Sequence, residues 1–122
     1  MMGISYAKLI RELLKRGKLH QPTYDQLVKA PPSATKSLAH YLLNHRNPDI
    51  RHYCAHIPGD RGLARAIPSL MEALRDTEEY VRQDALWSIE RLSGFEPGKL
   101  QYLLQITSID EAKELHLAIQ KW

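Results

Sequence analysis

Two histidines and one cysteine, His52, Cys54 and His56, lie close together in the sequence, and these residue types ligate metals or act as nucleophiles. On a helix, His52 and His56 share a face because residues four apart are neighbours, whereas Cys54 points away from them. Two ligands do not complete a metal site, and His40 and His45 have no fixed relation to this pair. No Cys-x-x-Cys pair occurs either. We therefore expect surface histidines, no metal and no cofactor.

Length and composition describe the chain that must position these side chains. Its 122 residues allow one domain, with 43% hydrophobic and 25% charged residues. Mean hydropathy is −0.42, and no apolar run approaches the ~18 residues of a membrane span. The first eight residues lack the apolar core of a signal peptide, and a single cysteine excludes an internal disulfide. A single cytoplasmic domain over residues 1–122 is expected.

Charge is distributed unevenly along the chain. Residues 1–35 carry six basic and two acidic side chains, a net +4, and residues 36–65 carry a net +3. Residues 66–122 carry six basic and ten acidic side chains, a net −4. The pI of about 9.1 is compatible with nucleic acid and equally with an acidic protein surface. A basic face on the first helix is expected from the following residues: Lys8, Arg11, Lys15 and Arg16.

The hydrophobic pattern is helical throughout, with no stretch long enough to predict a strand. Gly17 is expected to end a first amphipathic run that begins at residue 4, and Pro31-Pro32 to end a second. Asn47-Pro48 fits a helix N-cap followed by proline at the first helical position. Residues 58–62 (PGDRG) are expected to form a turn between helices, and Gly94 to end a later helix. About eight short helices are predicted.

A repeat with a period of 31 residues runs through the middle of the chain. The shift places one segment on the next as follows: Ile50 on Val81, Arg51 on Arg82, and Cys54 on Ala85. A second shift makes residues 97–122 a degenerate third copy. Residues 4–30 have the length of a leading helix pair without a matching sequence.

The segment 63–94 resembles a HEAT repeat, most closely the HEAT-like type named after phycobilin lyases. The resemblance is carried by a proline in the first helix, a following aspartate, and a Val-Arg pair and a small residue in the second: Pro68, Asp76, Val81, Arg82 and Ala85. It is weaker over 34–58, where His45 replaces the aspartate. The resemblance implies an all-α solenoid of about four antiparallel helix pairs. Residues 1–30 would form a divergent pair, and residues 33–58, 63–94 and 97–122 the repeats.

The apolar periodicity agrees with stacked helix pairs. Over 78–92, apolar residues recur at spacings of four, four and three: Val81, Ala85, Ile89 and Leu92. The preceding helix, 63–75, carries a similar stripe with Leu70 and Leu74. One pair cannot bury such a seam alone, so pairs must stack. In this register Cys54 is a core residue, where a thiol is inert, and we predict no catalytic residues.

Asp76 and two arginines have an expected structural role. Arg51 and Arg82 stand near helix starts, where the helix dipole disfavours a cation. The resemblance implies a hydrogen-bond ladder between adjacent repeats, in which Asp76 pairs with Arg51 or Arg82.

A second stripe lies beside the core seam and is expected to bind a partner. On helix 78–92 it comprises Tyr80, Asp84, Trp87 and Arg91, and the repeat register adds Tyr53, His56 and Trp122 from the neighbouring copies. Aromatic and arginine side chains on an exposed face are typical of protein interfaces. The alternative is that Trp87 and Tyr53 pack between repeats.

These features favour a non-catalytic module that binds another protein, as an adaptor, an assembly factor or a toxin-immunity-type inhibitor. One alternative is nucleic-acid binding through the basic N-terminal half. Another is an enzyme resembling a bilin lyase or a HEAT-like DNA-repair enzyme, in which Asp84 and Trp87 would act. The net −4 of residues 66–122 argues against DNA lying across that stripe.

Overall fold

The computed structural model describes residues 5–94, 100 and 110. Within these residues the helices and strands are, in order, α1 (Tyr6–Arg11), β1 (Leu14–Lys15), β2 (Lys18–Leu19), α2 (Gln21–Leu27), α3 (Thr35–Asn44), α4 (Pro48–Arg61), α5 (Ile67–Ala73) and α6 (Glu79–Ser93). Two short 3-10 helices, Pro32–Ala34 and Ala64–Ala66, lead into α3 and α5.

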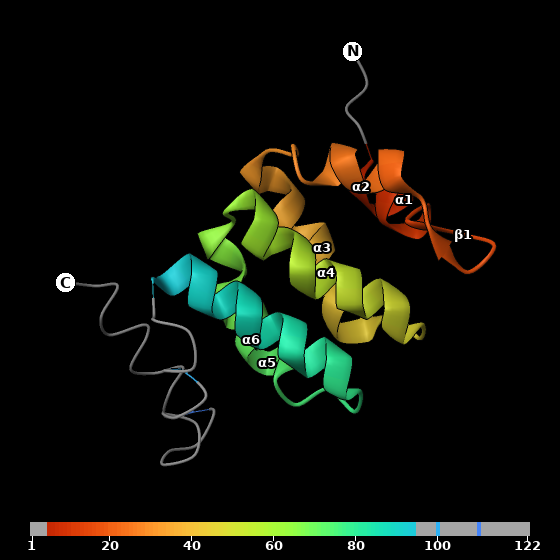
Figure 1. Cartoon of the computed structure of the whole chain (residues 1–122). Coiled ribbons are helices and arrows are strands. Elements are labelled where there is room, and N and C mark those ends of the chain that lie inside the picture. The colour runs from red at the N-terminus through yellow and green to blue at the C-terminus, as the bar shows by residue number, and fades with distance from the viewer. Residues whose placement is uncertain (1–4, 95–99, 101–109, 111–122) are drawn as a thin grey trace.

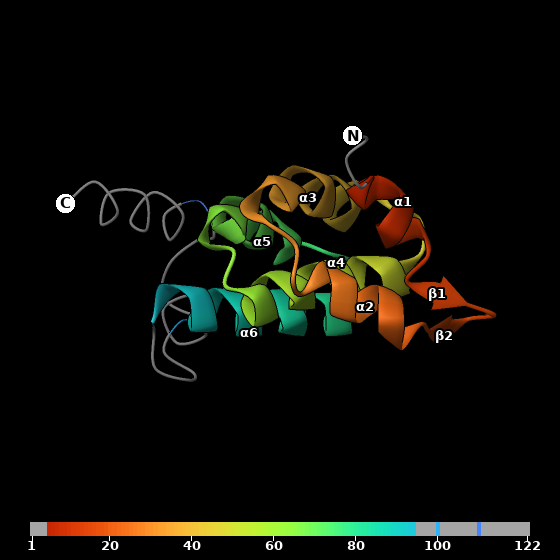
Figure 2. The same cartoon turned by 90° about the horizontal axis from the view of Figure 1, so that it is seen from above.

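The helices form two layers (Figure 2). One layer contains α1, α3 and α5, and the other contains α2, α4 and α6. Each first helix packs against the following second helix, α3 on α4 and α5 on α6, while α4 also packs along α6 and α3 along α5. This stacking of antiparallel pairs confirms the predicted all-α, solenoid-like fold. The predicted last repeat, 97–122, falls outside the described residues except for positions 100 and 110.

The core lies between the two layers. Val81, Ala85 and Ile89 of α6 and Leu70 of α5 are buried as predicted, whereas Leu74 is only partly buried. Cys54 of α4 is fully buried, which agrees with the position that the repeat register assigns to it. The 31-residue periodicity therefore identified the inward faces of both α4 and α6.

Helix α4 begins as predicted but ends later. The Asn47 side chain accepts a hydrogen bond from the Asp49 amide at 2.9 Å, with Pro48 at the first helical position. The turn predicted at residues 58–62 is wrong, because α4 continues through Pro58 to Arg61 and is capped by Gly62, which has a φ of 82°. Packing overrides the local signal here, since Pro58 and Gly59 are buried in the helix. Gly94 ends α6 with a φ of 77°, as predicted.

A β-hairpin stands where the sequence predicted a helix to residue 16. Helix α1 ends at Arg11, and β1 pairs antiparallel with β2, with Leu14 opposite Leu19. Arg16 and Gly17 form the two-residue connection with φ values of 55° and 78°, the conformation that matches strand twist in tight hairpins. The hairpin precedes the stacked pairs α3–α6 and leaves them intact.

Candidate functional site

The repeat is visible in the hydrogen bonds of two equivalent arginines. Nη1 of Arg51 donates to the His45 carbonyl at 2.8 Å, and Nη1 of Arg82 donates to the Asp76 carbonyl at 2.6 Å. Each guanidinium therefore binds the main chain six residues earlier, at the turn that precedes its helix. These carbonyl acceptors offset the unfavourable placement of a cation near the positive end of its helix.

Asp76 links the two repeats. Its carboxylate accepts from Nε and Nη2 of Arg51 at 2.9 and 3.1 Å, and also from the Glu78 amide at 2.9 Å. The two side chains are only 13% and 9% exposed. Burial alone would raise the pKa of Asp76, but the Arg51 and Glu78 hydrogen bonds outweigh it and lower the pKa. Of the two arginines that the sequence offered, Arg51 binds the carboxylate and Arg82 binds the Asp76 main chain.

His45 occupies the position of this aspartate in the preceding repeat. Its Nδ1 accepts from the Asn47 amide at 3.0 Å, just as Asp76 Oδ1 accepts from the Glu78 amide. Histidine thus retains the turn acceptor without a carboxylate. The substitution that weakened the sequence resemblance over 34–58 therefore preserves the local geometry.

Asp84 lies at the centre of the surface formed by α4 and α6. It pairs with His52 and with His56, the latter at 3.3 Å between Nδ1 and Oδ1. Burial would raise the pKa of Asp84, but the hydrogen bonds from both histidines lower it. The same Asp84 bond raises the pKa of His56 against the opposing effect of burial. The pair joins adjacent second helices.

The Trp87 ring is held by two neighbours. The His56 ring stacks on it with 4.2 Å between centroids and 1° between planes, and Arg91 lies over it at 4.8 Å. Nε of Arg91 also donates to the Gly59 carbonyl at 3.4 Å. Trp87 is half-buried while Arg91 is exposed, so the tryptophan is fixed at the surface of the helix layer.

Tyrosines extend this surface at both ends. Tyr80, which is exposed, donates to Asp49 Oδ1 at 3.1 Å. Tyr24 of α2 donates to Asp60 and meets Tyr53 edge-on at 6.2 Å. The structure therefore brings together the predicted stripe, apart from Trp122, which falls outside the described residues. We call the following six residues the α4–α6 ridge: Tyr53, His56, Tyr80, Asp84, Trp87 and Arg91.

Two residues that contact the α4–α6 ridge, Tyr24 and His52, were not predicted to lie beside it. Tyr24 lies in the N-terminal segment, where no sequence match supplies a register. The sequence places His52 on the same helix face as His56 and predicts an ordinary surface histidine there. In the structure His52 pairs with Asp84, and its ring packs edge-on against Tyr80 with 5.5 Å between ring centroids. Both contacts depend on how α4 is rotated against α6.

The predicted basic face does not lie on one helix. Lys8 and Arg11 belong to α1, Lys15 to β1 and Arg16 to the hairpin turn. All four are exposed, and Nη1 of Arg11 donates to the Tyr41 hydroxyl at 2.9 Å. Because the hairpin begins after α1, Lys15 and Arg16 do not share a helix face with Lys8 and Arg11.

Metal and thiol chemistry receive no support within the described residues. No group of three or more His, Cys, Asp or Glu side chains there is arranged to hold a metal. Burial raises the pKa of the Cys54 thiol, which makes the reactive thiolate unfavourable. In the same part of the chain, no helix is both long and apolar enough to cross a membrane.

Comparison with known proteins identifies the family. The family model described as HEAT repeats matches residues 35–121. The chain belongs to the HEAT-repeat family. HEAT repeats generally mediate protein–protein interactions as non-catalytic scaffolds. The match covers the stacked pairs α3–α4 and α5–α6, which are related by the 31-residue register. It does not confirm the more specific resemblance to the phycobilin-lyase type. No curated protein and no solved structure matched the chain.

Proposed function

We propose that this HEAT-repeat protein is a non-catalytic binding module whose protein partner docks on the α4–α6 ridge. The observation that carries the proposal is the Trp87 ring held at the surface by His56 and Arg91. An aromatic side chain that is already ordered loses little entropy on binding, so more of its contact energy contributes to affinity. Tryptophan and arginine are also the residues most enriched at interface hot spots.

The polar groups of the ridge would supply orientation. Asp84, Asp60 and Asp49 are already hydrogen-bonded to histidine or tyrosine side chains. A partner would therefore meet carboxylates that already accept some of their hydrogen bonds from neighbouring side chains of the protein. Such charges set specificity and register more than affinity. A surface of this kind suits an adaptor, an assembly factor or a toxin-immunity-type inhibitor.

The test begins with capture of the partner by the full chain and its identification by mass spectrometry. Trp87→Ala should then weaken binding by about 2 kcal/mol or more, roughly 30-fold in Kd. Leu43→Ala, which removes an exposed apolar side chain of α3, is the matched control and should bind normally. Circular dichroism and melting confirm that each variant is folded.

Nucleic-acid binding is the second candidate. It is favoured by the exposed hairpin cations Lys15, Arg16 and Lys18, which form no ion pair among the described residues. Binding of this kind weakens steeply with salt. If the Lys15→Glu, Arg16→Glu double variant loses its captured ligand while Trp87→Ala binds normally, the ridge proposal fails and this alternative stands.

A further inference from the structure

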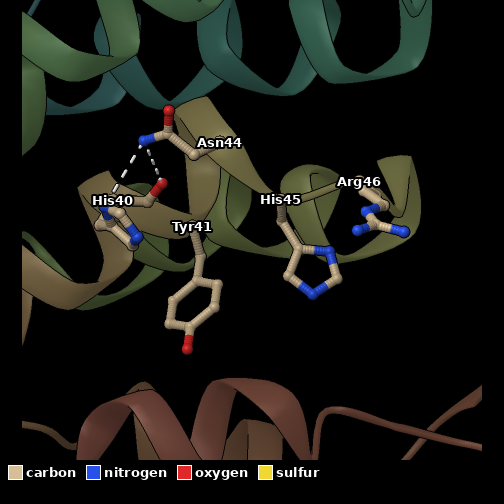
Figure 3. A pocket seen from close by; sticks show the side chains of 5 residues that line it. All are labelled: His40, Tyr41, Asn44, His45 and Arg46. Carbon is tan, nitrogen blue, oxygen red and sulfur yellow. Dashed lines mark hydrogen bonds between the residues drawn. The ribbon is translucent and has the colours of Figure 1, made fainter.

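A hollow of about 270 Å³ lies at the C-terminal end of α3, on the side that faces α1, away from the α4–α6 ridge. Five residues line it: His40, Tyr41, Asn44, His45 and Arg46 (Figure 3). None of these residues is acidic, and the volume is slightly below the ~300 Å³ at which pockets begin to enclose drug-sized ligands. The hollow therefore suits a compact group with hydrogen-bond acceptors.

The Tyr41 hydroxyl offers a donor there. Its oxygen already accepts from Nη1 of Arg11 at 2.9 Å. Its own hydrogen has no acceptor among the residues that the structure describes. The bond also brings the Arg11 guanidinium of α1 to the edge of the hollow, with its remaining N–H groups available.

His45 offers a second donor. Because its Nδ1 accepts from the Asn47 amide at 3.0 Å, the proton of the neutral ring resides on Nε2. Figure 3 shows the Nε2 edge of His45 and the Tyr41 hydroxyl pointing the same way, toward the neighbouring helix. The turn hydrogen bond thus orients the imidazole as well as fixing its tautomer.

The charge around the hollow is positive. Arg46 is exposed and its side chain has no ion-pair partner in the described part of the chain. The lining residues therefore supply one guanidinium group and two neutral donors and no carboxylate, and the Arg11 guanidinium joins them through its bond to Tyr41.

We propose that this hollow binds a phosphate group, either as inorganic phosphate or as the phosphate of a small monoester such as a nucleotide. Arg46 and Arg11 would contact the oxygens through charged N–H groups, with Tyr41 and His45 donating to the same oxyanion. Guanidinium groups match the geometry of phosphate oxygens, and charge-assisted bonds are the stronger class.

The test is a titration of the full chain followed by NMR of the His45 and Arg46 side chains. Inorganic phosphate should shift both signals to saturation, whereas sodium chloride at equal ionic strength should not. A nucleoside 5′-monophosphate in a parallel titration distinguishes the source. Tighter binding of the nucleotide indicates an organic phosphate, and equal affinity indicates that the phosphate alone is recognised.

Two variants and one control locate the site. Arg46→Ala should weaken phosphate binding about tenfold, the loss of one charge-assisted contact. His45→Asp should abolish binding while it keeps the turn, because Asp76 provides the same acceptor in the next repeat. Arg65→Ala, which removes an equal charge from an exposed site outside the hollow, should bind normally. The proposal is overturned if phosphate shifts nothing beyond the chloride control, or if Arg65→Ala weakens binding as much as Arg46→Ala.

Discussion

Arg51 and Arg82 hold equivalent positions in successive repeats, but Arg51 binds the Asp76 carboxylate of the next repeat while Arg82 binds the Asp76 main chain of its own repeat. Removing either partner of the Arg51–Asp76 pair leaves a buried polar group without a hydrogen bond, which substantially lowers the free energy of unfolding.

Asp76→Ala is expected to lower the free energy of unfolding by ~1–3 kcal/mol, because Arg51 and the Glu78 amide lose their acceptor. Denaturant unfolding measures this change. In double-mutant cycles, Asp76 should couple strongly to Arg51 and weakly to Arg82, which binds the Asp76 main chain instead. Equal coupling to both arginines would contradict the arrangement.

At the level of elements, the contact of α4 with α6 depends on a glycine inside a helix. A Cβ at Gly59 would lie 2.6 Å from Ser88 Oγ, 2.8 Å from Trp87 Cζ3 and 3.0 Å from Ser88 Cα. Ser88 in turn donates to the Ala55 carbonyl at 2.5 Å, so the two helices touch through main chain and small side chains. The close approach also sets the position of Trp87 on the ridge.

Gly59→Ala is therefore expected to destabilise the fold by ~1–3 kcal/mol, since overpacking must push the helices apart. The sign is the diagnostic feature, because alanine in place of glycine within an unobstructed helix stabilises by roughly 0.5–1 kcal/mol. Thermal melting provides the measurement, and loss of the Trp87 near-ultraviolet signal should accompany it. A stabilised variant with an unchanged tryptophan signal would show that the helices are further apart.

At the level of the whole molecule, ion pairs between neighbouring helices make stability depend on pH. The raised pKa of His56 contributes stability that is complete below its ordinary value of 6.5 and is lost as pH rises through the folded-state pKa. The lowered pKa of Asp84 contributes stability above its ordinary value of 3.8, which is lost as pH falls through the folded-state pKa. Asp60 and Arg91, which also face His56, oppose each other in effect.

These two groups should together produce greatest stability between about pH 4 and pH 6.5. We expect the free energy of unfolding to fall by up to about 1 kcal/mol between pH 6 and pH 8, since water screens this part-exposed pair. His56→Phe keeps a ring against Trp87 and removes the titration, so its profile over that range should be flatter. An unchanged slope in this variant would assign the pH dependence to other histidines.

The sequence alone determined the all-α class, the repeat period and the inward faces, because burial recurs along a helix at spacings that apolar residues reveal. It also predicted the caps at Asn47 and Gly94, and the resemblance to HEAT repeats implied the pairing of Asp76 with an arginine. The helical class, the period, the inward faces and the caps depend on local patterns or on residues 31 apart in register. They require no knowledge of how one helix rotates against another.

Only the tertiary structure decided the continuation of α4 through Pro58 and the choice of Arg51 as the partner of the Asp76 carboxylate. It also placed Tyr24 beside Asp60 and Arg11 beside Tyr41, at least 30 positions away in the sequence. Tyr24 and Arg11 belong to an N-terminal segment whose sequence does not match the repeat. The reason is physical: helix ends and side-chain partners follow the packing between layers, which can outweigh local propensities of about 1 kcal/mol per residue.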